Sequence, residues 1–174
     1  MFEKILCPTD GSEHAEKAAA LAGDLAAKYD AELVLVHVLM SHASSDDLRK
    51  FADIEGLATD VRPEIDRLRT LEQPMLAASA PARAEPIANE VLERIGNYAL
   101  ESAMRAAEAK GVSAVSTRLE QGDPGKRILE CAEEEGADTI VMGSRGLGRI
   151  KGLLVGSVSQ YVSSRAPSTC ISVK

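Results

Sequence analysis

The stretch from Leu33 to Leu39 (LVLVHVL) constrains the fold of this chain more than any other. Apolar residues occupy both alternating sets of its positions, so a strand formed here has two faces to bury. Strands covered on both faces are typical of parallel sheets, whose crossover helices pack on either side. Further strands are predicted at 4–7, 115–120, 139–141 and 169–173. Apolar and polar residues alternate at 115–120, which indicates an edge strand.

Helix signals alternate with the predicted strands. Ser12 is a good N-cap, and the alanines after it recur at three-and-four spacing on a stripe that runs to Tyr29. Further helices are predicted at 85–110, where Gly111 ends the helix, from near Pro124 to Gly136, and from Ser157 onward. This alternation predicts a doubly wound α/β fold. The length of 174 residues agrees with a single domain, 1–174.

Residues 41–86 interrupt this regular order as a long insertion between the second strand and its helix. The segment is polar at first and ends at 77–84 in a run of alanine, serine and proline that is typical of a linker. Loops of this length are either functional or disordered. A mobile linker and a lid over the ligand side of the sheet are both compatible with the sequence.

A glycine-rich stretch follows the predicted strand at 139–141. It has glycines at 143, 146, 148, 152 and 156, and Ser157 then begins a helix. A strand, a glycine loop and a helix start together favour phosphate binding, because backbone N–H groups and the helix dipole point at the anion. The stretch is neither a P-loop nor a Rossmann fingerprint. The pair Gly125-Lys126 is followed by arginine, and Gly146-Leu-Gly148 is followed by glycine at 152 instead of 151.

The spacing Gly143-x-x-Gly146, nine residues, then Gly156-Ser157 resembles the nucleotide-binding signature of the universal stress protein (UspA-like) family, in its ATP-binding branch. The resemblance covers most of the chain and leaves 41–86 as a departure. It implies a five-stranded parallel, Rossmann-like sheet in the order 3-2-1-4-5 with helices on both faces. Winding reverses between strands 1 and 4 in that order, and ligands bind beside such a switch point. Asp10 and Gly143 are therefore expected to face each other across one crevice.

The resemblance also implies the ligand, ATP with Mg²⁺, and the residues that hold it. Pro8, Thr9 and Asp10 line the adenosine end, Val38 offers backbone groups to the adenine edge, and Met142 and Gly143 lie beside the ribose and α-phosphate. Gly146, Gly156, Ser157, Val158 and Ser159 surround the phosphates, whose charge Arg145 and Arg149 oppose. Taken alone, Asp10 in Asp-Gly-Ser is typical of a turn, but its position at the switch point favours the binding role.

The sequence shows little reaction chemistry. The three cysteines and three histidines have no metal-ligand spacing, no Ser–His–Asp order is visible, and Glu133, Glu134 and Glu135 read as a solvated helix end. The leading interpretation is an ATP-binding stress-response protein that regulates a partner protein of unknown identity. A slow ATPase or phosphotransferase using the same site, and an interaction protein that binds no nucleotide, are the alternatives.

Composition and charge limit the kinds of partner that this chain can bind. A net charge of -7 and the absence of Trp argue against nucleic acid. No apolar run approaches the roughly 20 residues of a membrane span, and the first residues enter a strand directly, so a cytoplasmic protein without membrane insertion is expected. The family resemblance implies a homodimer in which the last strand, Thr169 to Val173, pairs across a two-fold axis. An exposed edge strand gives a physical motive for that pairing.

Overall fold

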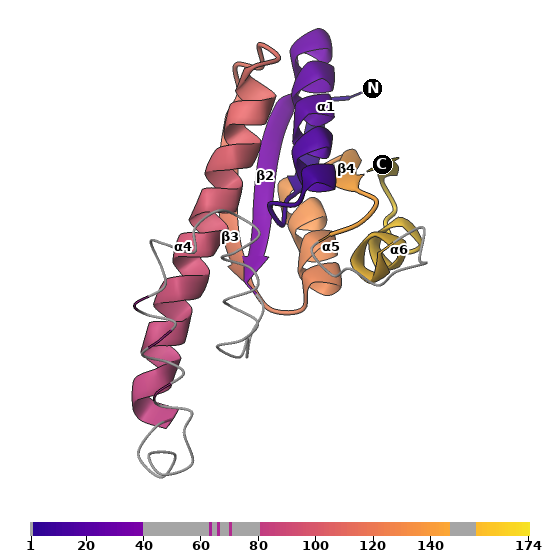
Figure 1. Ribbon diagram of the computed structural model, residues 1–174. Coiled ribbons are helices and arrows are strands. Elements are labelled where there is room, and N and C mark those ends of the chain that lie inside the picture. Colours follow the sequence, from indigo (N-terminus) through magenta and orange to yellow (C-terminus); the bar gives the residue numbers. More distant parts are fainter. Residues whose placement is uncertain (1, 40–62, 64–65, 67–69, 71–80, 147–155) are drawn as a thin grey trace.

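The computed structural model describes residues 2–39, 63, 66, 70, 81–146 and 156–174, with side chains of 81–88 left aside. The elements along the chain are β1 (Lys4–Pro8), α1 (Glu13–Tyr29), β2 (Glu32–Leu39), α4 (Pro81–Glu108), β3 (Val115–Gln121), α5 (Pro124–Glu135), β4 (Thr139–Gly143), α6 (Ser157–Ser163) and β5 (Thr169–Val173). Figure 1 shows that α4 runs along β2 and extends well past its carboxyl end.

The strands form one parallel sheet in the order β3-β2-β1-β4-β5. The predicted fold class and strand order are confirmed, including the edge position of β3. In the centre of the sheet, Ile5 of β1 pairs with Leu33 of β2 on one side and Thr139 of β4 on the other. β1 ends at Pro8, which pairs with Val36, whereas β2 continues to Leu39. At the carboxyl edge of the sheet, β2 therefore extends past the end of β1 and leaves a step above β1.

Helices α1 and α4 cover one face of the sheet. Alanines of both helices pack on Leu33 and Leu35 in a core of mostly small residues. A Cβ added at Gly23 of α1 would lie 2.5 Å from the carbonyl oxygen of Ala107 in α4. The backbones of α1 and α4 thus approach each other closely at this point, a contact between helices that the sequence does not predict.

Helices α5 and α6 cover the opposite face. Ile128, Cys131 and Ala132 of α5, the predicted inner face of that helix, are buried together with Val162 of α6. They pack on larger apolar side chains of the sheet, which are Leu6, Val34, Val36, Ile140 and Met142.

The predicted helix ends are largely confirmed. Ser12 caps α1 by accepting a hydrogen bond from the N–H of Ala15, and Asp123 caps α5 by accepting one from the N–H of Lys126. Gly136 ends α5 with a φ of 65°, in the left-handed region that favours glycine. α4 begins at Pro81 instead of 85, so part of the predicted linker is helical. Proline is compatible with a first helical position because it has no N–H to satisfy there.

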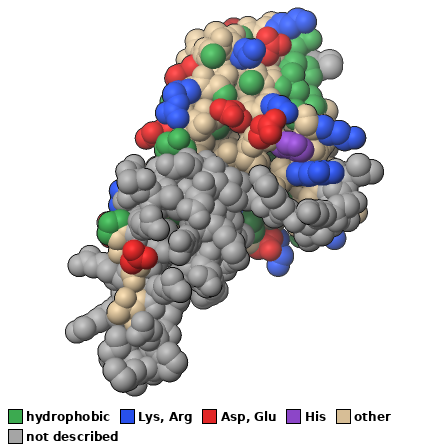
Figure 2. Space-filling view, viewed as in Figure 1, with side chains coloured by type: hydrophobic (Ala, Val, Ile, Leu, Met, Phe, Trp, Pro, Cys, Tyr) green, Lys and Arg blue, Asp and Glu red, His purple; other side chains and the backbone are tan. Residues whose placement is uncertain are grey.

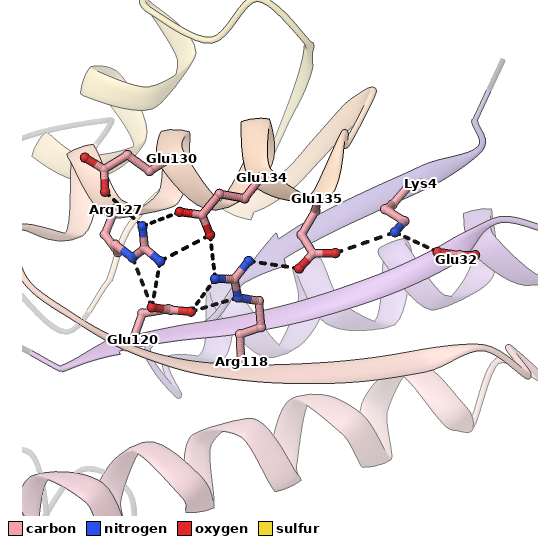
Figure 3. A network of polar contacts seen from close by, with 8 residues as sticks. All are labelled: Lys4, Glu32, Arg118, Glu120, Arg127, Glu130, Glu134 and Glu135. Atoms are coloured by element: carbon pink, nitrogen blue, oxygen red, sulfur yellow. Dashed lines mark hydrogen bonds and ion pairs between the residues drawn. The ribbon is translucent and has the colours of Figure 1, made fainter.

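One prediction about exposure is wrong. Tyr29 is predicted on the buried stripe of α1, but it is 46% exposed and packs beside Phe2, with ring centroids 4.9 Å apart. At the end of α5, Glu133 and Glu134 are exposed as predicted, but Glu134 and Glu135 also form ion pairs with Arg118 (Figure 3). The segment 41–86 falls mostly outside the described residues, and its two interpretations stay predictions.

A network of ion pairs fastens α5 to the sheet (Figure 3). Arg118 of β3 lies 2.6 Å from Glu134, 2.7 Å from Glu120 and 2.8 Å from Glu135. A second arginine, Arg127 of α5, contacts Glu120 from the other side at 2.9 Å. The network continues through Lys4, which bridges Glu135 of α5 and Glu32 of β2.

On the face viewed in Figure 2, acidic and basic side chains of the described residues are interspersed. Ion pairs also join residues one helical turn apart, with Lys17 2.7 Å from Glu13 in α1 and Arg105 3.9 Å from Glu101 in α4. Among the described residues, no helix combines the length and the apolar character that crossing a membrane requires.

Candidate functional site

The turn after β1 is held in one conformation by its own side chains. Thr9 continues the sheet beyond β1, because its N–H donates to the Val36 carbonyl at 2.9 Å. Its hydroxyl accepts from the N–H of Gly11 at 3.2 Å, and the Asp10 carboxylate accepts from the N–H of Ser12 at 3.1 Å. Gly11 has a φ of 78°, which suits glycine. Asp10 is thus a turn residue, as one interpretation held, and its carboxylate is fixed at the carboxyl end of the sheet.

The end of β4 packs directly against the start of α1. A Cβ added at Gly143 would lie 2.9 Å from the carbonyl carbon of His14 and 3.0 Å from the nitrogen of Ala15. These are backbone atoms of a helix, which cannot move aside easily. The fold itself therefore requires glycine at 143, whatever the site binds.

The two described ends of the glycine-rich stretch are tied together at Ser144. Its side chain is 1% exposed, and its N–H donates to the Val173 carbonyl of β5 at 2.6 Å. The Ser144 carbonyl in turn accepts from the N–H of Gly156 at 2.7 Å and from the Ser159 hydroxyl at 2.9 Å. Residues 147–155, with Arg149, lie outside the described part of the chain.

Gly146 meets Asp10. A Cβ added at Gly146 would overlap a carboxylate oxygen of Asp10, and the Ser12 hydroxyl donates to the neighbouring Arg145 carbonyl at 3.4 Å. Asp10 follows β1, and Gly146 lies in the stretch after β4. The structure thus brings together, beside the switch point of the sheet, two predicted site residues that are far apart in sequence.

Gly156 differs from Gly143 and Gly146. It is the N-cap of α6 with a φ of −74°, and a Cβ there would meet its nearest neighbours, Arg145 Cα and the Ser144 carbonyl, at 3.5 Å. Both are ordinary contacts, so neither the backbone conformation nor the packing of the described residues requires glycine at 156. A Cβ at 156 would therefore meet the described residues only at ordinary contact distances.

The start of α6 supplies backbone donors. Gln160 is the residue whose N–H closes the first helical bond, to the Gly156 carbonyl at 3.0 Å. The N–H groups of the preceding residues 157–159 have no acceptor within the helix. The Ser159 hydroxyl is 2.9 Å from the Ser144 carbonyl and 3.0 Å from the Gly156 carbonyl, so this side chain closes the loop. Its backbone N–H, not its hydroxyl, is the group that suits an anion.

Val38 places backbone groups above the end of β1. Alternate residues of a parallel strand direct their N–H and C=O to opposite neighbours. The Val36 carbonyl accepts from Thr9 on the β1 side, whereas the Leu39 carbonyl accepts from Gly122 on the β3 side. Val38 therefore directs its N–H and C=O to the β1 side, beyond Pro8, where β1 has ended. Its side chain packs on the α5 face.

The remaining predicted residues have simpler surroundings. Met142 is 4% exposed and belongs to the core beneath α5, and Arg145 is exposed. His14 lies beside this region, with its Nδ1 3.3 Å from the Ser144 hydroxyl. Within the described ranges, no group of three or more His, Cys, Asp or Glu side chains is arranged to hold a metal ion.

His37 has a role at this edge that the sequence analysis did not assign. Its Nδ1 lies 2.9 Å from the Thr9 carbonyl, directly before Asp10. Burial lowers the pKa of His37 from its ordinary value, although the Thr9 carbonyl and the Asp10 carboxylate act in the opposite direction. A signal was present, because His37 is the polar interruption on the face that Leu33, Leu35 and Leu39 otherwise keep apolar.

Comparisons with known proteins agree with this architecture. The family described as Usp, the universal stress protein family, matches residues 1–174. A universal stress protein of Thermus aquaticus is 33% identical over 174 residues, covering 100% of both chains.

Two solved structures share the fold. UspA from Lactobacillus plantarum has a TM-score of 0.69 at 22% identity, covering 99% of this chain and 98% of that one. A universal stress protein in complex with cAMP has a TM-score of 0.60 at 23% identity, with 99% and 96% covered. The match over the whole length and the sheet order together show that this chain belongs to the universal stress protein family.

Proposed function

We propose that this protein binds ATP with Mg²⁺ at the carboxyl ends of β1 and β4 and acts as a nucleotide-dependent regulatory protein. The observation that carries the proposal is the contact between Asp10 and Gly146. It joins the turn after β1 to the glycine-rich stretch after β4 at the switch point, where doubly wound sheets bind their ligands. A family member of the same fold was solved with cAMP, so an adenine nucleotide is the first ligand to test.

The adenosine end would lie over the step above β1. The Asp10 carboxylate is a fixed acceptor for a ribose hydroxyl, and a charged acceptor forms a stronger hydrogen bond than a neutral one. Val38 directs one donor and one acceptor of the backbone to the same place, which matches the edge of an adenine ring. Pro8 and Thr9 would form the wall beside the sugar.

The phosphates would lie between Gly146 and the start of α6. The backbone N–H groups of Ser157, Val158 and Ser159 suit the anion. Arg145, which is exposed in the stretch after β4, would add positive charge near the phosphates. Met142 and Gly143 would support this end from below. Mg²⁺ is commonly held by phosphate oxygens and water with few protein ligands.

Regulation is favoured over rapid catalysis by the same residues. Phosphoryl transfer needs a positioned base or water-orienting group at the phosphates. In this proposal the Asp10 carboxylate is assigned to the ribose, and one of its oxygens already accepts from the N–H of Ser12. Binding without fast turnover is the behaviour expected of a nucleotide-dependent regulator with a protein partner, and the cytoplasm stays its predicted location.

A homodimer through β5 belongs to the same proposal. β5 lies at one edge of the sheet, and Cys170 and Ile171 are partly exposed on it. Pairing two copies of this edge would cover both. Sedimentation at micromolar concentration should give a dimer, and a monomer there would contradict this part of the proposal.

The first experiment is a calorimetric titration of nucleotide-stripped protein with Mg·ATP, using Gly156→Val as the test variant. At position 156 the φ of −74° suits any residue and a Cβ meets the described residues at no less than 3.5 Å, so we expect the fold to be kept, while the valine side chain would occupy the space before α6 that the phosphates need. We expect wild-type binding in the micromolar range and none in the variant. Gly143→Val is unsuitable, because its side chain would collide with the backbone of α1.

Ser163→Val is the matched control, since it adds a similar side chain at an exposed position at the other end of α6. It should bind as wild type does. Wild-type protein that gives no heat and no thermal shift with Mg·ATP would contradict the proposal and favour the interaction-protein alternative. Phosphate release from the same samples, lost in Gly156→Val, would identify the slow ATPase.

A further inference from the structure

His37 contacts three parts of the molecule, which are β2, α4 and the turn after β1. Its side chain projects from β2 on the α4 face, beside Leu35 and Leu39. From there its Nδ1 reaches the carbonyl of Thr9 at 2.9 Å, across to the chain that leaves β1. Thr9 is 6% exposed, so water has little access to that carbonyl. A buried carbonyl without a donor is costly, which gives this contact energetic weight.

The direction of the hydrogen bond is settled by its partner. A carbonyl oxygen can only accept, so the contact requires that Nδ1 carry its proton. The neutral tautomer with Nδ1–H therefore suits the site. An imidazole protonated on Nε2 instead would direct a bare nitrogen at the carbonyl, and the two would repel.

Helix α4 leaves room for the ring through a glycine. A Cβ added at Gly96 would lie 2.9 Å from His37 Cδ2, 2.6 Å from Leu119 Cδ1 and 3.0 Å from Leu39 Cδ2. Glycine in a helix interior is destabilising relative to alanine. The absence of a side chain at position 96 is what allows the ring to lie between α4 and the sheet.

The carbonyl that His37 holds belongs to the turn that presents Asp10. That turn is fixed on its other side by the bonds from Gly11 to Thr9 and from Ser12 to Asp10. Those bonds are local, whereas the His37 side chain joins the turn to β2, beside the main-chain bond from the Thr9 N–H to the Val36 carbonyl. Losing the His37 contact would remove one of these two bonds between Thr9 and β2, so we expect the turn, and Asp10 with it, to be held less firmly.

We propose that His37 is a positioning residue for the adenosine end of the site, which it maintains by donating from Nδ1–H to the Thr9 carbonyl across the space left by Gly96. The inference rests on the proposed nucleotide site. His37 acts through the turn and does not touch the ligand. It also makes α4 a neighbour of the site, because a change in the position of α4 would be transmitted to the ring.

The test compares His37→Leu, which keeps the bulk but removes the donor, with His37→Asn, whose side-chain nitrogen can occupy nearly the same place as Nδ1. Affinity for AMP and for ATP is measured by calorimetry on both variants and wild type. We expect His37→Leu to weaken both ligands by the same factor, about tenfold, as for a buried acceptor that loses its donor. His37→Asn should restore most of this affinity. Equal affinities in wild type and His37→Leu would overturn the proposal.

A second measurement does not depend on nucleotide binding. Amide hydrogen exchange of Gly11 and Ser12, whose N–H groups bond within the turn, is followed in ligand-free protein. Exchange at these two amides should accelerate in His37→Leu and in Gly96→Ala, which crowds the ring, and return towards wild type in His37→Asn. If wild type binds no nucleotide, the proposed function fails, and this readout still decides whether His37 positions the turn. Unchanged exchange in His37→Leu would refute it.

Nitrogen NMR of wild-type protein covers the case in which His37→Leu does not fold. The His37 ring should show a protonated Nδ1 and an unprotonated Nε2 near neutral pH. A spectrum with the proton on Nε2 alone would overturn the proposal, because Nδ1 could not then donate to Thr9.

Discussion

The two faces of the sheet are assembled in different ways. Among the described residues, alanine makes up seven of the fourteen buried core residues beneath α1 and α4, but two of the ten beneath α5 and α6. On the first face the helices approach until Gly23 meets the backbone of Ala107. On the second, longer apolar side chains fill the core, and ion pairs of Arg118 and Arg127 hold α5 (Figure 3).

The two faces therefore differ in how well they can adjust to a changed side chain. Contacts between backbones leave no side chain to rotate, so the α1/α4 face depends on small residues at fixed positions. Contacts between side chains can relax, and ion pairs can re-form with other partners. The turn at Asp10 and the end of β4 at Gly143 both lie against the less adaptable face. A rigid support of this kind keeps a binding site pre-organised.

The largest effect is expected from Gly23→Ala. The new methyl group would lie 2.5 Å from the Ala107 carbonyl oxygen, and helix α1 or α4 must shift to admit it. We expect a loss of about 2 kcal/mol in the free energy of unfolding, the usual size for overpacking. Urea denaturation followed by circular dichroism measures it. A stability equal to wild type would show that the two helices can slide apart, which would remove the proposed contrast.

The matched control is Gly125→Ala on the other face. Its methyl group would meet the ring of Tyr161 at 2.7 Å, so a side chain and not the backbone of a helix has to shift. The loss in the free energy of unfolding should be about 1 kcal/mol, the lower end for overpacking. A loss as large as in Gly23→Ala would mean that both faces are equally rigid.

An intermediate effect is expected from Arg118→Met, which keeps the length of the side chain but leaves Glu120, Glu134 and Glu135 without one partner. The free energy of unfolding should fall by about 1 kcal/mol at low salt, towards the upper end for exposed ion pairs, because the pairs are part of a network. In about 1 M salt, where screening is strong, the difference in the free energy of unfolding between wild type and Arg118→Met should become smaller. A difference that does not depend on salt would assign the loss to packing.

The smallest expected effect is on the pH dependence of stability, to which the two faces contribute in different pH ranges. Burial lowers the pKa of His37 on the α4 face below its ordinary value of 6.5. Below about pH 6.5 the unfolded chain therefore binds a proton that the folded protein resists, and stability falls. Arg127 and Arg118 lower the pKa of Glu134 on the α5 face from 4.5 to about 2, so its contribution is lost only as pH falls from 4.5 towards 2.

Thermal unfolding between pH 7.5 and 2 tests both windows. His37→Asn should flatten the pH dependence between about pH 7 and 5, and Arg118→Met should flatten it below pH 4.5. If His37→Asn and wild type have the same slope above pH 5, then His37 titrates alike in the folded and unfolded states.

The sequence was sufficient for features that depend on neighbouring residues. The strand of apolar residues from Leu33 to Leu39, the caps at Ser12 and Gly136 and the start of α6 at Ser157 all have local causes. Periodicity and capping act within a few residues, so they can be read without a fold. The spacing of glycines between 143 and 157 likewise indicated the family that the comparisons confirmed.

Features that depend on distant residues could not be read in this way. The role of Gly143 comes from the backbone of α1, and the ordinary surroundings of Gly156 come from Ser144 and Arg145, so two glycines of one motif have different physical reasons. The glutamates at the end of α5 are charged residues on an exposed turn until β3 places Arg118 beside them.

The order of elements, the parallel sheet and the family can be inferred from the sequence, because each follows from local patterns of apolar residues, caps and glycines. The folded chain adds the contact of His37 with the turn of Asp10, the contact of Gly146 with the Asp10 carboxylate, the backbone contact between α1 and α4, and the ion pairs that hold α5. These contacts cannot be inferred from local patterns, because each joins residues that come together only when the sheet and its helices have assembled.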